Sequence, residues 1–275
     1  MGIPRNAFIG LAATAAVIAA VFAVATLGPA GQTAGTPRPL PRLEGKPNLT
    51  GLWQSLSGAN WDLQAHEARP GPAQFGALFS EPGSVGVVEG NVIPYQPSAL
   101  ATKQANFAKR WTSDPEAKCY LPGVPRATYM PYPFQIVQGS RKLLITYEFA
   151  TASRLIPLDD PGESPAETWM GWSKGRWEGD VLVVAVNSFN DQTWFDRTGN
   201  FHSDALSVVE RYTLASPDVI KYEATITDPK VFTRPWRVSL PLYRRVEENA
   251  QFLEYKCVPF SEELIYGHLR RKTDG

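Results

Sequence analysis

From residue 133 onward, hydrophobic positions alternate with polar ones in short runs, and turn residues separate the runs. Short runs with this period of two are typical of strands that bury one face. The predicted strands are residues 134–138, 142–150, 153–158, 167–173, 181–189, 206–214, 220–227, 236–243 and 251–258. Because short loops join successive runs, we expect antiparallel neighbours in a meander. A meander without protected edges favours closure into a barrel, so the predicted fold class is mainly all-β.

The chain before residue 133 is irregular and rich in turn residues. One short helix is predicted over residues 98–111, with Ser98 as its N-cap, and a second over residues 261–270. These helices are additions to a β domain and do not change its class.

Residues 7–27 form an apolar run that follows Arg5, the one charged side chain among the first 35 residues. This pattern is typical of an export signal, and the run is also long enough to span a membrane. Residues 1–30 are therefore predicted to be a signal peptide or an N-terminal membrane anchor, and membrane contact is expected only through residues 7–27 if they stay uncleaved. Residues 31–47, rich in Pro and Gly, are predicted to be a linker, and residues 48–275 a single barrel domain.

Charge and cysteine content narrow the class of protein. The chain balances 27 Lys and Arg against 27 Asp and Glu, whereas nucleic-acid partners usually require a basic excess. Cys119 and Cys257 are its only cysteines. In an exported domain an isolated pair is more often a disulfide than a metal or redox site, with two separate buried thiols as the alternative. The predicted location is periplasmic or extracellular, with an anchor in the inner membrane as the alternative if residues 7–27 are retained.

Two sequence motifs resemble those of known protein families. Gly51-Leu52-Trp53 is similar to the Gly-x-Trp strand of lipocalin-like barrels, and residues 169–184 read WMGWSKGRWEGDVLVV. The longer motif resembles the GdSxGrWEGDtLVV signature of a family of exported bacterial proteins, over about residues 49–266. The resemblance implies export and a common fold, without an established activity. This chain departs from the signature at Trp172, where Asp or His is expected, and at Val181, where Thr is expected.

Strand alternation marks one carboxylate. Glu210 shares a face with four apolar or aromatic residues, Leu206, Val208, Tyr212 and Leu214. A buried carboxylate is costly, so Glu210 must be paired, protonated or in contact with a wet cavity. It is a candidate general acid or base, or half of a buried pair with an arginine. Tyr212, on the same face, is a candidate ligand contact.

A second carboxylate lies in a hairpin. A turn centred on Thr151 places Glu148 directly across from Arg154, which predicts a cross-strand ion pair. On the barrel wall such a pair is structural. In the lumen it would anchor an anionic or hydroxylated ligand.

Residues 188–204 form a long stretch without strand pattern, which suggests a functional rim or lid. His202 is its candidate for proton transfer, and hydrogen bonding to a backbone carbonyl is its structural alternative. Trp194 in this loop and Trp172 are candidate ligand contacts among eight tryptophans. Three scattered histidines argue against zinc, and the chain carries no nucleotide-binding motif, so no metal and no cofactor are expected.

These observations predict an exported barrel that binds a small apolar or aromatic molecule in an internal pocket lined by Glu148, Arg154, Trp172, Trp194 and Tyr212. The first alternative is a cofactor-independent lyase, isomerase or hydrolase that uses Glu210 or His202 as acid or base. The second alternative is a structural module of the cell envelope.

Overall fold

The computed structural model describes residues 38–271. The predicted signal peptide or anchor, residues 1–30, and the first part of the predicted linker lie outside the described residues. One compact unit begins at Leu40. Its first element is a short hairpin of β1 (Arg42–Leu43) and β2 (Lys46–Pro47), within the stretch predicted as a linker. Between residues 38 and 271, no helix is long and apolar enough to cross a membrane.

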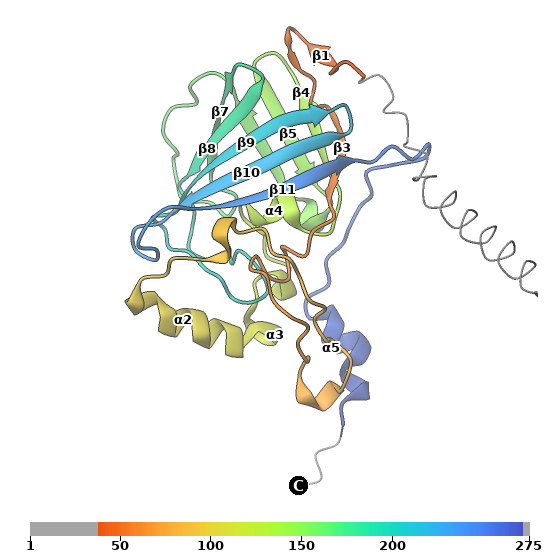
Figure 1. Cartoon of the computed structure of the whole chain (residues 1–275), viewed down its shortest axis with the longest axis vertical. Helices are drawn as coiled ribbons and strands as arrows, with labels where there is room; N and C mark the ends of the chain where they lie inside the picture. The colour runs from red at the N-terminus through yellow and green to blue at the C-terminus, as the bar shows by residue number, and fades with distance from the viewer. Residues whose placement is uncertain (1–37, 272–275) are drawn as a thin grey trace, which may run out of the picture. The chain divides into compact units, whose positions relative to one another are not determined.

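A nine-stranded antiparallel sheet forms a nearly closed barrel, which confirms the predicted fold class (Figure 1). The strand order is β6-β5-β4-β3-β11-β10-β9-β8-β7. The strands are β3 (Gly51–Ser55), β4 (Phe134–Gln138), β5 (Lys142–Tyr147), β6 (Ser153–Pro157), β7 (Trp172–Glu178), β8 (Val181–Asn187), β9 (Ser207–Ser216), β10 (Val219–Thr227) and β11 (Trp236–Arg244).

Side chains close the barrel between its two end strands, β6 and β7. Among the described residues no backbone ladder joins these strands. Gly175 of β7 faces β6 so closely that an added Cβ would lie 2.7 Å from Cγ2 of Ile156. Arg154 of β6 donates a hydrogen bond across the same gap to Oγ of Ser173 in β7, at 3.1 Å. Packing of β6 against β7 therefore requires a residue without a side chain at position 175.

The first strand of the barrel, β3, contributes a buried tryptophan to the core. Trp53 is fully buried, and its indole nitrogen donates to the carbonyl of Leu49 at 2.8 Å. The Arg244 guanidinium lies over the Trp53 ring, 4.2 Å from its centroid. The Gly-x-Trp motif of this strand therefore places an anchored ring in the core.

Two predicted strands were wrong. Residues 167–173 are largely irregular, and β7 instead runs through Gly175 to a tight turn at Gly179, which has φ +59°. The gap between the predicted strands 167–173 and 181–189 implied a turn around Gly175, but this residue lies within β7 and makes the strand contact just described. Residues 251–258 form no strand. The free side of β11 pairs with β3 at Leu242–Arg244, and residues 251–258 do not extend the sheet there.

Figure 1 shows the helices gathered beneath one end of the barrel. Pro97 takes the first helical position of α2, and Gln96 is its N-cap in place of the predicted Ser98. The predicted helix over residues 98–111 is divided into α2 and α3. The α-helices are α2 (Pro97–Ala108), α3 (Arg110–Ser113), α4 (Arg126–Tyr129) and α5 (Ser261–Tyr266), and the 3₁₀ turns are Ala73–Phe75, Glu89–Asn91, Glu116–Lys118, Phe149–Thr151 and Gly267–Leu269.

Candidate functional site

Glu210 lies fully buried inside the barrel, on the face predicted for it. Arg154 of β6 holds its carboxylate with two bonds, Nη2 to Oε2 at 2.6 Å and Nη1 to Oε1 at 3.2 Å. The hydroxyls of Tyr212 and Tyr222 donate to Oε1 at 2.9 and 2.8 Å. Burial, together with the Glu210 carboxylate, raises the pKa of both tyrosines, so they remain donors. Of the alternatives that the sequence left open for Glu210, the structure therefore contains the buried pair with an arginine.

Polar side chains of the interior surround this pair, although Nε of Arg154 is buried without a hydrogen-bond partner in the described part of the chain. Arg154 also donates to the Tyr147 hydroxyl at 3.4 Å. The two best-formed cavities among the described residues are lined by other side chains, and neither includes Glu210, Arg154 or Tyr212. These three predicted site residues therefore bind one another and hold the barrel together.

The predicted pair of Glu148 with Arg154 was wrong. The register pairs Ile145 with Arg154, so the hairpin is centred between Phe149 and Ala150 rather than on Thr151. Glu148 instead accepts a hydrogen bond from the backbone nitrogen of Leu253 at 2.8 Å. Its role is to attach the C-terminal segment to this turn.

His202 is buried in the long loop, with 3 % of its surface exposed. Its Nδ1 lies 2.9 Å from the carbonyl of Ser203, so Nδ1 carries the proton, and Nε2 accepts from the Thr193 hydroxyl at 2.6 Å. The hydroxyl of Ser203 donates to Asp228, at 2.9 Å. No Ser–His dyad therefore forms, and the structural role is the one observed.

Burial lowers the pKa of His202, although the Ser203 carbonyl and the carboxylates of Asp228 and Asp191 oppose the shift. Since the unfolded chain binds the proton first, at a pKa near 6.5, stability is complete above that pH and falls as the pH drops below it. We expect wild type to lose up to ~1.4 kcal/mol of unfolding free energy per pH unit in this range. Urea unfolding at pH 7.5 and 5.5 measures the slope. His202→Gln should flatten it, and the exposed His268→Gln should not; equal slopes in all three proteins would contradict this assignment.

The two predicted tryptophan contacts lie apart from Tyr212. Trp172 alternates with the inward-facing Ser173 on β7, and its indole donates to the carbonyl of Gly162 at 3.2 Å. Trp194 pairs through its backbone with Phe201 in the long loop. Neither ring lines either of the two best-formed cavities among the described residues. The structure therefore does not bring the predicted ligand contacts together.

A cavity of about 300 Å³ lies instead outside the barrel, between the irregular segment before residue 133 and the C-terminal segment. Phe75, Phe79 and Trp111 form one aromatic wall, and the Phe79 ring packs on the other two at 5.2 and 5.8 Å between centroids. A second aromatic cluster, of Tyr132, Phe149 and Tyr255, also lines the cavity. Trp61 and Phe260 complete the aromatic lining.

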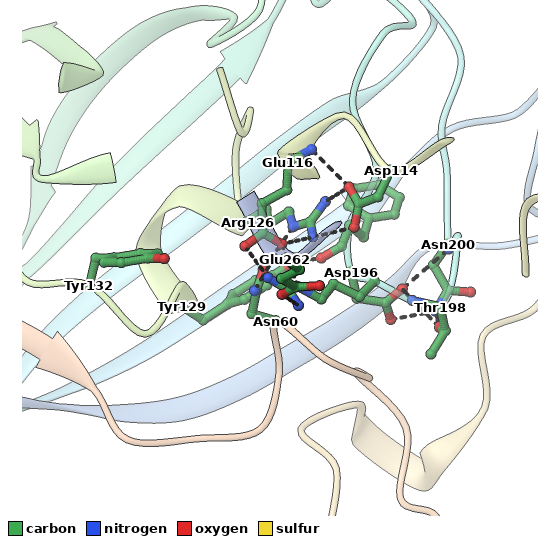
Figure 2. A network of polar contacts seen from close by, with 12 residues as sticks. Asn60, Asp114, Glu116, Arg126, Tyr129, Tyr132, Asp196, Thr198, Asn200 and Glu262 are labelled. Atoms are coloured by element: carbon green, nitrogen blue, oxygen red, sulfur yellow. Dashed lines mark hydrogen bonds and ion pairs between the residues drawn. The ribbon is translucent and has the colours of Figure 1, made fainter. Parts of the chain in front are cut away.

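A buried charge cluster supports this cavity (Figure 2). Arg126, the first residue of α4, donates two bonds to Asp114 at 2.8 and 2.9 Å and one to Glu116 at 2.7 Å. Its Nε donates to Asn60 at 2.8 Å. Arg197 holds the other side of Glu116 with bonds of 2.8 and 2.9 Å. The cluster thereby joins four segments that are distant in sequence at one point beneath the barrel.

The charges in this cluster balance. Burial opposes ionisation of Glu116, but the guanidinium groups of Arg197 and Arg126 outweigh it and lower the pKa of Glu116 to about 2. The two carboxylates of Asp114 and Glu116 thus face two arginines. At the cavity mouth Nη1 of Arg197 also bonds Glu262 of α5 at 2.9 Å, and the Arg197 guanidinium stacks on Trp61, 4.1 Å from the ring centroid.

The long loop is fixed by a second buried carboxylate. Asp196 accepts five hydrogen bonds, from the backbone of Leu63, Thr198 and Asn200 and from the side chains of Thr198 and Asn200 (Figure 2). Burial, with Asp62 nearby, raises the pKa of Asp196. This anchoring places the neighbouring Arg197 at the cavity. The loop is therefore part of the site, through Arg197 rather than through His202.

Sequence reasoning missed the residues of this cavity. Residues 60–132 lack periodicity, so no pattern indicates which of their side chains face inward. Composition gave no signal either, because the aromatic content of this segment is close to that of the whole chain.

The lining of the cavity consists mainly of aromatic side chains and of charged side chains that are paired. Its aromatic faces suit an apolar or aromatic molecule, and its carboxylates are already paired with arginines. Within the part of the chain that the structure describes, no cluster of His, Cys, Asp and Glu could hold a metal ion. Comparison with family models, with curated proteins and with solved structures finds no match for this chain.

Proposed function

We propose that this protein is an exported β-barrel protein that binds a small, uncharged apolar or aromatic molecule in the cavity beneath its barrel. The observation that carries the proposal is the aromatic lining over a cluster of paired charges. A volume of about 300 Å³ lies at the lower end of the range for small-molecule sites. The pocket that we propose is outside the barrel, whereas the sequence pattern suggested one within it.

The ion pairs support an uncharged ligand. Arg197 is paired with Glu116 and Glu262, and Glu263 is paired with Arg270. A charged ligand would have to displace one of these partners, and breaking a pair leaves its other half without compensation. The Tyr132 hydroxyl donates to that of Tyr255 at 3.3 Å, which leaves the proton of Tyr255 for a ligand acceptor.

Export is supported by the cysteine pair and by the sequence. Cys119 and Cys257 lie at bonding distance, with 2.02 Å between the sulfurs, as an oxidising compartment favours. The apolar run at residues 7–27 and the resemblance to exported bacterial proteins agree with this location. No specific observation favours the enzyme or the envelope module, since Glu210 and His202 are bound to separate partners.

Titration with N-phenyl-1-naphthylamine, a neutral aromatic dye that fluoresces in apolar surroundings, tests the proposal. Thr112 is exposed and lines the cavity mouth, so Thr112→Trp should fill the mouth and weaken dye binding at least tenfold. Thr102 of α2 is exposed and lies outside the lining, so Thr102→Trp should bind as wild type does. Equal affinities in all three proteins, or no saturable binding by wild type, would exclude the cavity as the site.

A further inference from the structure

The C-terminal residues 251–271 form one side of the cavity. Eight of the residues that line it come from this segment, among them Tyr255, Phe260 and Glu262. The segment contains only α5 and one 3₁₀ turn, and it contributes no strand to the barrel. The cavity is therefore complete only while this segment is docked.

Separate points of contact hold the segment. On its near side, Leu253 binds Glu148 through its backbone, and the Tyr255 ring lies 4.7 Å from that of Tyr132. In the middle, Cys257 is bonded to Cys119. Beyond this bond, all the contacts are noncovalent.

The far part, residues 258–271, has four main contacts. The backbone nitrogen of Phe260 donates to the carbonyl of Ala117 at 2.8 Å, and that of Arg271 donates to the carbonyl of Gln74 at 2.8 Å. Glu262 accepts from Arg197 at 2.9 Å. The Tyr266 ring packs edge-on against Phe79, with 5.5 Å between centroids.

This far part buries little apolar surface of its own. Leu264 is 70 % exposed and Ile265 is 56 % exposed. Segments with few buried apolar contacts and few backbone hydrogen bonds open at a lower free energy than the core. Lids that cover binding sites are drawn from such segments.

We propose that residues 251–271 are a strap that opens to admit and release the ligand, with Cys257 as its pivot and the ion pair between Arg197 and Glu262 as its latch. This inference rests on the proposed function for the identity of the occupant. Because Cys257 stays attached to Cys119, opening is confined to residues 258–271. Reduction frees the whole strap and couples access to the cavity to the redox state of its surroundings.

Stopped-flow kinetics with N-phenyl-1-naphthylamine and hydrogen exchange of the full chain test the strap together. Glu262→Gln weakens a partly exposed latch, so it should raise both dye association and dissociation rates about two- to fivefold in the oxidised protein. The control is Glu254→Gln, whose carboxylate lies on the same segment and pairs only with the exposed Lys256 among the described residues. It should leave both rates unchanged. Reduction should speed amide exchange in residues 258–271 while β9 and β10 keep their protection.

The outcomes separate the two proposals. Dye binding with rates insensitive to Glu262→Gln and to reduction, and with unchanged exchange in residues 258–271, would overturn the strap and leave the cavity as the binding site. An absence of dye binding would overturn the proposed function. In that case, faster exchange of residues 258–271 in Glu262→Gln than in Glu254→Gln would still support the strap, and equal exchange would overturn it.

Discussion

Glu210→Gln is expected to lower the free energy of unfolding by about 3–5 kcal/mol, because it leaves the buried charge of Arg154 without its partner. Arg154 and Glu210 are both almost fully inaccessible to water, so solvent cannot compensate. The amide oxygen of the substituted side chain still accepts from Tyr212 and Tyr222, which isolates the loss of charge from the loss of these bonds. Urea unfolding at pH 7 measures the change.

Glu178→Gln is the matched control for this prediction. Its carboxylate also binds two arginines, Arg176 and Arg211, but on the exposed outer face of the barrel. Exposed ion pairs contribute little to stability, so this variant should unfold nearly as wild type does. If Glu210→Gln also costs less than about 1 kcal/mol, the pair is not a stabilising element of the barrel, and a functional role for Glu210 regains support.

Arg126→Met is expected to cost about 3–5 kcal/mol as well, since it leaves the buried carboxylates of Asp114 and Glu116 uncompensated on one side. It should also weaken dye binding, because Arg126 joins the segments on which the cavity rests. Arg126→Lys keeps the charge but cannot reproduce four hydrogen bonds in a planar fork, so an intermediate loss is expected. Chemical unfolding and dye titration on the same samples measure both effects.

Arg141→Met is the control for the effect of removing an arginine. Its side chain is 80 % exposed and pairs with the exposed Asp159, so stability and dye binding should stay close to wild type. Wild-type stability in Arg126→Met would show that the cluster does not support this end of the fold. Normal dye binding in a destabilised but folded Arg126→Met would separate the cluster from the cavity.

The sequence pattern predicted some of the strands correctly and others wrongly. Period-two alternation predicted β4 with its observed bounds and placed Glu210 inside the barrel. The same alternation also suggested a strand at residues 251–258, because a pattern cannot show that β3 is the segment that pairs with the free side of β11, at Leu242–Arg244. Local periodicity thus reports which face a residue takes, and the pairing of strands decides whether a strand forms.

The site depended on contacts that no local pattern encodes. Arg154 was assigned to Glu148, a near neighbour in sequence, whereas its partner Glu210 is brought to it only when the barrel closes. Likewise, Arg126 and Arg197 meet at Glu116 through irregular segments. Disulfide pairing was predictable because only two cysteines are present, and their sulfurs do lie at bonding distance.

Photolabelling with benzophenone, which is small, neutral, aromatic and itself photoreactive, tests the location of the ligand site most directly. After irradiation of the oxidised full chain, mass mapping of peptides should find saturable adducts in those carrying Trp111 and Thr112 and in those carrying residues 255–263. Excess N-phenyl-1-naphthylamine should suppress these adducts. Saturable adducts confined to the inward faces of β9 and β10, or labelling that never saturates at any peptide, would contradict a binding site in the cavity beneath the barrel.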